Sequence, residues 1–149
     1  MTFTSDSEAA TIALGRKLAR EILPEKGFVI LSGNLGAGKT TLVKGIAAER
    51  TGVDENEVSS PTFALIHEYG DPARVYHIDL YRLESPAELA TLGLEDLEDR
   101  DALVLLEWGE RFAQFLPPPV AAIHLTTGEN RKLISVKLLD GSGNLTLGQ

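Results

Sequence analysis

A glycine-rich segment that ends in a lysine and a threonine carries the strongest chemical signal in the sequence. It runs from Gly33 to Thr40, reads GNLGAGKT, and matches the pattern G-x-x-x-x-G-K-[ST] throughout. Its glycines let backbone N–H groups approach phosphate oxygens, and the N-terminus of the following helix adds partial positive charge. In such a loop Lys39 reaches the β- and γ-phosphates, and the Thr40 hydroxyl ligates magnesium. The segment therefore predicts a site for a nucleoside triphosphate with Mg²⁺.

Two carboxylates could supply the acid that a P-loop needs to hold the metal ion or its waters. Glu107 follows the apolar run ALVLL, and Asp79 follows VYHI. If both runs are strands of a doubly wound sheet, their carboxyl ends lie at the ligand crevice. Burying an unpaired carboxylate is costly, so a nearby cation would explain either acid. Each could instead be a surface acid after a strand, and the choice between them for direct magnesium contact stays open.

The sequence favours adenine over guanine as the base of the nucleotide. It contains no N-K-x-D motif, which a guanine-reading site would need. Its one D-x-x-G, from Asp140 to Gly143, lies in the tail after the last predicted strand, which is the wrong place for a GTPase switch.

The glycine-rich segment lies between a predicted strand and a predicted helix, which is the setting that the motif requires. Phe28 to Ser32 is a short apolar run with the length and β-branched content of a buried strand. The helix that follows begins at Lys39 and is expected to end at Gly52. The site is thus expected to be built on the end of a central strand.

The remaining segments predict a sheet with antiparallel additions. Two S-x-x-E capping boxes, at Ser5 and Ser85, each indicate the start of a helix. The expected elements are a first helix from near Asp6, a hairpin of Phe63–Tyr69 with Arg74–Leu80, a short helix ending at Gly93, a strand Ala102–Leu106, a short helix Glu110–Phe115, and a hairpin of Val120–Thr126 with Leu133–Leu139. We therefore expect an α/β fold: a single P-loop NTPase domain over residues 1–149, with a mixed, partly antiparallel sheet flanked by helices and a frayed tail at 141–149.

Composition excludes several classes of function. The 149 residues include no cysteine, which removes disulfides, thiol catalysis and zinc–thiolate sites. The formal net charge of −8 disfavours direct binding of nucleic acids or anionic membranes. There is no signal-peptide pattern and no apolar run near the ~20 residues of a membrane span, so a cytoplasmic location without membrane contact is expected.

Four segments in this order resemble the TsaE family, the bacterial P-loop ATPases required to make threonylcarbamoyladenosine in tRNA. The segments are GNLGAGKTTLVKG, SSPTFALIHEY, YHIDLYRL and LLEWGERF, and the resemblance spans nearly the whole chain. It implies a compact P-loop domain in which Thr40 and Glu107 bind the metal ion. The phosphate-binding residues implied by the motif and the family together are Gly33, Gly36, Ala37, Gly38, Lys39, Thr40 and Thr41.

The resemblance also implies roles for residues outside the loop. Asp79 matches a position thought to act on the attacking water or the metal, and Thr62 lies where the family has a switch-like loop that senses the γ-phosphate. Thr11 and Arg131 resemble positions that hold the nucleotide from its base side. Trp108 is either an exposed aromatic for contact or gating, or a core aromatic.

Other candidates have a plainer interpretation. Arg82 could serve phosphate charge, but we interpret it as a solvated hairpin arginine, and the tyrosines Tyr76 and Tyr81 as packing residues. The histidines lack metal-ligand spacing and are expected to be sheet residues with local partners, although one of them neighbours the Asp79 motif: His67, His77 and His124.

The expected reaction is hydrolysis of ATP to ADP and phosphate, with Lys39, Asp79, Glu107 and Thr62 as the catalytic candidates. No arginine finger can be assigned, and its absence costs ~10³ to 10⁵ in rate, so slow turnover and stimulation by partners are expected. The resemblance implies TsaD and TsaB as those partners, with tRNA reached only through them. Two alternatives are a free-standing P-loop small-molecule kinase and a non-catalytic adapter whose conformation ATP fixes.

Overall fold

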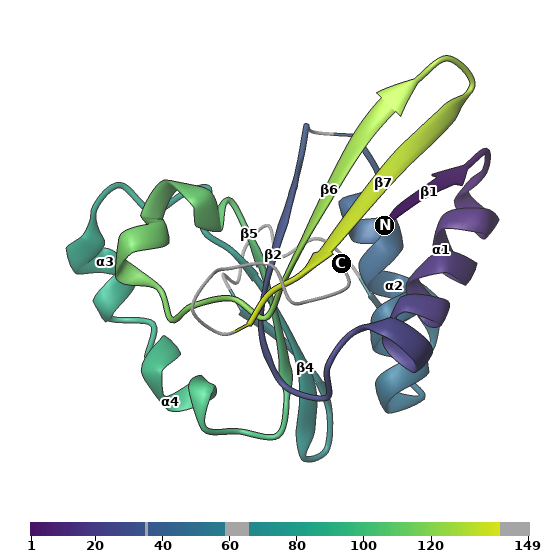
Figure 1. Ribbon diagram of the computed structural model, residues 1–149. Coiled ribbons are helices and arrows are strands. Elements are labelled where there is room, and N and C mark those ends of the chain that lie inside the picture. Colours follow the sequence, from purple (N-terminus) through teal and green to yellow (C-terminus); the bar gives the residue numbers. More distant parts are fainter. Residues whose placement is uncertain (35, 59–65, 141–149) are drawn as a thin grey trace.

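The computed structural model describes residues 1–34, 36–58 and 66–140 (Figure 1). The predicted switch residue Thr62, the start of the predicted strand at residues 63–65 and the predicted tail at 141–149 lie outside these ranges.

A seven-stranded mixed sheet forms the centre of the described part of the molecule, in the order β1-β7-β6-β2-β5-β4-β3. Its middle strands β2, β4, β5 and β6 run parallel, whereas β3, β7 and β1 are antiparallel to their neighbours. The strands are β1 (Thr2–Ser5), β2 (Gly27–Gly33), β3 (Ile66–Gly70), β4 (Ala73–Asp79), β5 (Leu103–Glu107), β6 (Ala121–Gly128) and β7 (Arg131–Leu138). The predicted fold class, including both hairpins and the mixed sheet, is confirmed.

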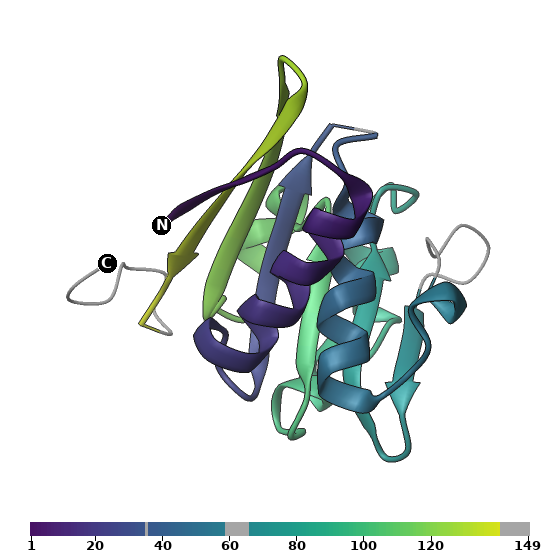
Figure 2. The same cartoon turned by 90° about the vertical axis from the view of Figure 1, so that its right-hand side faces the viewer.

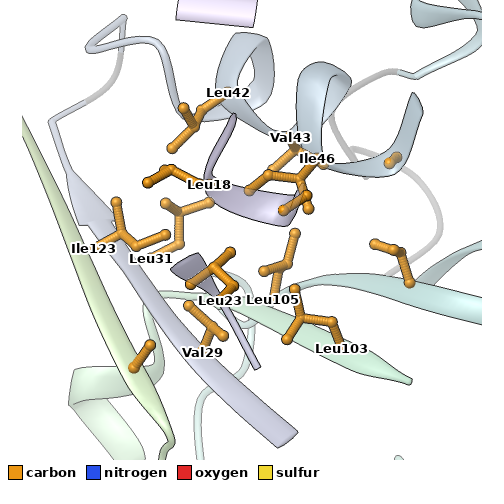
Figure 3. Close-up of a cluster of buried hydrophobic side chains, with 14 of the residues drawn as sticks. Leu18, Leu23, Val29, Leu31, Leu42, Val43, Ile46, Leu103, Leu105 and Ile123 are labelled. Atoms are coloured by element: carbon orange, nitrogen blue, oxygen red, sulfur yellow. The ribbon is translucent and has the colours of Figure 1, made fainter. Parts of the chain in front are cut away.

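Two helices cover one face of the sheet (Figure 2). These are α1 (Glu8–Lys17), which continues through a π-helical turn (Leu18–Ile22), and α2 (Lys39–Thr51). Apolar side chains of both helices pack on inward-facing residues of the central strands, because alternate residues of a strand share a face (Figure 3). Leu42 and Ile46 of α2, for example, lie against Leu31 and Leu105, and all four are fully buried.

Short helices cover the opposite face, so the sheet lies between two layers (Figure 1). They are α3 (Pro86–Ala90), α4 (Leu94–Glu98) and the 3₁₀ segment η3 (Gly109–Phe115). A further 3₁₀ turn, η2 (Glu55–Glu57), follows α2. On this face Ile78 and Leu106 belong to a second apolar cluster with Phe112 of η3. The odd-numbered residues at the ends of β4 and β5 therefore face α2 and the glycine-rich loop.

Helices α1 and α2 touch through their backbones at two glycines. A Cβ on Gly15 would lie 2.3 Å from the carbonyl oxygen of Leu42, and a Cβ on Gly45 would lie 2.1 Å from that of Ile12. No larger residue fits at either position without a shift of the backbone. This contact fixes α1 closely against the helix that begins at the glycine-rich loop.

The start of the first helix was predicted wrongly. Residues Thr2–Ser5 form the edge strand β1, paired with β7, and the helix cap is Ser7, whose hydroxyl accepts a hydrogen bond from the amide of Ala10 at 3.0 Å. Ser5 is instead buried and bonded to Thr11. Pairing with a strand over a hundred residues away outweighs the local capping pattern, and sequence spacing does not reveal such pairing.

Candidate nucleotide-binding site

The glycine-rich loop follows the end of β2 and leads into α2, as predicted. Gly33, Gly36 and Gly38 have φ angles of 145°, 81° and 102°, which residues with a side chain rarely adopt. The amide of Ala37 donates to the carbonyl of Asn34 at 3.0 Å and closes a turn inside the loop. These conformations bend the backbone around the N-terminus of α2, where unpaired N–H groups attract anions.

A cavity of about 250 Å³ lies against this loop and brings most of the predicted residues together. Two of the predicted phosphate-binding residues do not line it: Ala37 is buried, and Gly33 contributes its carbonyl to Lys39. The lining residues are Gly36, Gly38, Lys39, Thr40, Thr41, Asp79, Glu107, Trp108 and Lys132. The cavity sits at the carboxyl ends of β4 and β5, where the topology of a parallel sheet puts ligand sites.

Lys39 is buried and held by three neighbours in the cavity. Its Nζ donates to the carbonyl oxygen of Gly33 at 2.7 Å and lies 3.4 Å from Oε1 of Glu107. The same ammonium lies 5.0 Å from the ring centroid of Trp108, within cation–π range. A buried ammonium needs such partners, and phosphate oxygens could take their place.

Glu107 ends β5 and is 5% exposed. Its Oε2 accepts a hydrogen bond from Nε2 of His77, which is completely buried on β4. Burial on its own would raise the pKa of the Glu107 carboxyl, but the hydrogen bond and charge of His77, together with the charge of Lys39, outweigh it and hold the pKa below its ordinary value. Glu107 is therefore set up to be an anion facing the phosphate loop.

Asp79 lies next to Glu107 in the register of β4 and β5 and lines the same cavity. It is more exposed than Glu107, and its Oδ1 accepts a hydrogen bond from the amide of Tyr81 at 2.9 Å. The alternative that Asp79 and Glu107 are isolated surface acids after a strand therefore does not hold.

The oxygen donors of this cavity suit magnesium. Thr40 offers a hydroxyl, and Asp79 and Glu107 offer carboxylates. Mg²⁺ is usually held by one or two carboxylates together with phosphates and waters, rather than by a cage made only of protein groups. In the described ranges, no group of three or more His, Cys, Asp or Glu has metal-binding geometry.

Trp108 is neither a fully exposed aromatic nor a fully buried core residue, the two environments that the sequence allowed. It is half-buried at the edge of the second apolar cluster and has a left-handed φ of 64°. Its ring packs against that of Tyr81, with 5.0 Å between the centroids and a tilt of 50°. Tyr81 packs on Trp108 as a residue that is 57% exposed and so lies outside the core, whereas Tyr76 is in the core. Arg82 is exposed and lines a separate hollow beside these rings, away from the phosphate loop.

A second cavity, of about 290 Å³, adjoins the first at Lys132. Its lining combines the start of α1 with the β6–β7 turn, namely Ser5, Asp6, Ser7, Glu8, Thr127, Gly128, Asn130, Arg131 and Lys132. Arg131 is therefore near the first cavity, as a base-side residue would be. Thr11 does not line either cavity, because it is buried with its hydroxyl 2.6 Å from that of Ser5 and 3.1 Å from the carbonyl of Ser7. It supports the segment that forms the cavity wall.

Sequence reasoning missed Lys132 and the partner of His77. The Nζ of Lys132 donates to the carbonyl of Gly36 at 3.2 Å, which puts a second cation at the phosphate loop. Lys132 alternates with the buried residues Ile134 and Val136, and this pattern could have extended the predicted strand to include it. The other histidines do have local neighbours, since His124 bonds the hydroxyl of Ser32 at 2.7 Å and His67 packs edge-on to Tyr69.

Comparisons with known proteins agree on one family. The model for "Threonylcarbamoyl adenosine biosynthesis protein TsaE" matches residues 5–134. The chain is 38% identical to the tRNA threonylcarbamoyladenosine biosynthesis protein TsaE of Rickettsia conorii, over 87% of this chain and 73% of that one. It is 41% identical to the Nostoc protein of the same name, over 85% of this chain and 78% of that one.

A solved structure supports the same assignment. The crystal structure of Bacillus subtilis YdiB superposes with a TM-score of 0.70 at 27% identity, and the match covers 91% of this chain and 83% of that one. The residues matched by the family model include the glycine-rich loop and both carboxylate-bearing strands. This chain therefore belongs to the TsaE family.

Proposed function

We propose that this chain binds ATP with Mg²⁺ and hydrolyses it, as the nucleotide-dependent subunit of a system that makes threonylcarbamoyladenosine in tRNA. The observation that carries the proposal is a cavity at the glycine-rich loop whose lining brings together Lys39, Thr40, Asp79 and Glu107. A cation, a hydroxyl and two carboxylates beside exposed helix amides are the groups that a P-loop uses for phosphoryl transfer.

In this mechanism the loop binds polyphosphate through its amides, and Lys39 exchanges the Gly33 carbonyl for phosphate oxygens. Thr40 and Glu107 would hold Mg²⁺, which when bound neutralises negative charge on the phosphates. Asp79, beside Glu107, would orient the attacking water, alone or with Thr62. The ribose and base would extend toward the cavity of Arg131 and Lys132.

Slow turnover without partners is part of the proposal. No arginine of the described ranges lines the phosphate cavity. Arg111, on the neighbouring 3₁₀ segment, already donates to the carbonyls of Tyr81 and Leu83 at 2.7 and 3.0 Å. We propose that an arginine for the transition state is supplied by partner subunits that resemble TsaD and TsaB.

The net charge of −8 supports a role in which tRNA is held by those partners. No helix of the described residues is both long and apolar enough to cross a bilayer. A cytoplasmic location is proposed from the tRNA-modifying role.

The test is calorimetry with ATP and Mg²⁺, followed by phosphate release with and without the partner subunits. Lys39→Ala should abolish ATP binding and phosphate release. Lys44→Ala, on the same helix but outside the cavity, should preserve ATP binding and phosphate release. Absence of binding by the unaltered chain would refute the proposal. Binding with partner activation that survives Lys39→Ala would favour the adapter, and phosphate transfer to an added acceptor would favour a kinase.

A further inference from the structure

His77 is a buried polar residue without a role in the hydrolytic mechanism proposed above. It lies two residues before Asp79 on β4, so both side chains project from the face that carries α2 and the glycine-rich loop. Its side chain has no solvent exposure. Nε2 contacts Oε2 of Glu107, and Nδ1 has no hydrogen-bond partner in the described ranges.

The direction of the hydrogen bond follows from the chemistry of the pair. A carboxylate beside the ammonium of Lys39 is ionised at neutral pH, and an ionised carboxylate only accepts hydrogen bonds. Nε2 of His77 must therefore carry a proton and donate it. This hydrogen bond fixes Oε2 of Glu107 against the buried ring of His77.

The other oxygen, Oε1, is the one next to Lys39, a residue that lines the cavity. It lies 3.4 Å from Nζ of Lys39, longer than a good charge-assisted hydrogen bond. The last torsion of a glutamate side chain is soft, so a free carboxylate next to an ammonium would rotate to contact it with both oxygens. The hydrogen bond from His77 opposes that rotation.

We propose that His77 is a positioning residue that keeps Oε1 of Glu107 directed at the metal position instead of closing onto Lys39. The inference rests on the proposed function, since it assumes that Glu107 ligates the metal that accompanies the nucleotide. Histidines and carboxylates in such outer contacts typically change metal affinity 10- to 100-fold when they are removed.

The test compares two amides of different length at position 77. The amide nitrogen of glutamine can reach the position of Nε2, whereas that of asparagine stands near Nδ1 and falls short of Glu107. Calorimetry with ADP, in EDTA and at increasing free Mg²⁺, measures how much the metal strengthens nucleotide binding. His77→Asn should weaken that enhancement about 10-fold or more, and His77→Gln should retain most of it.

Controls separate positioning from general damage. His67→Asn removes the cross-strand neighbour of His77 and should leave the Mg²⁺ enhancement intact. In a Glu107→Gln background, His77→Asn should cause no further change. Equal Mg²⁺ enhancement in the unaltered chain and in His77→Asn would overturn the inference while leaving the proposed function standing; absence of nucleotide binding by the unaltered chain would instead refute the proposed function.

If His77→Asn does not fold, nitrogen NMR of the unaltered protein decides. We expect the His77 proton on Nε2 both in the free protein and with Mg-ADP bound. A proton found only on Nδ1 in the Mg-ADP complex would overturn the inference, because Glu107 would then have no donor.

Discussion

The ammonium of Lys39 and Oε1 of Glu107 lie 3.4 Å apart inside the cavity proposed for polyphosphate. The two charges therefore partly neutralise each other before a ligand binds. Any phosphate that enters must compete with a carboxylate for the lysine, and any cation must compete with the lysine for the carboxylate.

The variant Glu107→Gln should distinguish the competition of phosphate for Lys39 from the competition of the metal ion for Glu107. Without the negative charge, Lys39 is free for phosphate, so ATP binding in EDTA should strengthen by several-fold. The additional gain from Mg²⁺ should largely disappear, because a neutral amide binds Mg²⁺ more weakly than a carboxylate. Calorimetry with and without Mg²⁺ measures both effects, and an unchanged Mg²⁺ gain would show that Asp79, not Glu107, holds the metal.

The stability of the fold should depend on pH through Glu107. Its pKa is lowered in the folded chain: burial raises it, but the hydrogen bond of His77 and the charges of His77 and Lys39 lower it by more. A carboxyl whose folded pKa is depressed stabilises the fold above its ordinary pKa of about 4. That stabilisation is lost as the pH falls through the lower folded value. Urea unfolding from pH 7 to pH 3 should therefore show the stability difference between the unaltered chain and Glu107→Gln shrinking toward acid pH, whereas a constant difference would contradict this.

Gly45→Ala should destabilise the fold although alanine is the better helix former. The new Cβ would lie 2.1 Å from the carbonyl of Ile12, so the helices must separate, at a cost of about 1–3 kcal/mol. Gly52→Ala is the control: it has open space but a φ of 76°, so it tests backbone strain without a clash. Denaturant unfolding of both variants checks the prediction, which fails if Gly45→Ala is as stable as the unaltered chain.

Lys132→Ala should weaken ATP binding without unfolding the chain. Its Nζ is 3.2 Å from the carbonyl of Gly36, so it is close enough to the loop to reach a bound phosphate. A hydrogen bond to a charged group contributes about 1.5–3 kcal/mol, so a loss of about 10-fold or more is expected. Lys137 lies on the opposite face of the same strand, so the variant Lys137→Ala should bind ATP normally. Equal affinities of the two variants would exclude Lys132 from the site.

Local patterns predicted the loop and its carboxylates, because they depend on nearby residues and on one topological rule. The glycines and Lys39 are adjacent in sequence, and Glu107 follows from the position of ligand sites at strand ends. Alternation could have placed Lys132 on a strand, but its contact with Gly36 depends on the parallel pairing of β6 with β2, and the burial of Ser5 depends on the pairing of β1 with β7. No local pattern encodes partners that distant. The contact of His77 with Glu107 depends on the register of β4 against β5, which a one-residue slip would abolish.

The backbone contact between α1 and α2 also limits how the site could diverge. Helix α1 begins at the wall of the second cavity, which Arg131 lines, and helix α2 begins at the glycine-rich loop. Gly15 and Gly45 hold the two helices together without intervening side chains. The separation of the two cavities is consequently set by main-chain packing. Adapting the protein to a longer or shorter ligand would require the two helices to be repacked together, and substitutions at the cavity surface alone would not suffice.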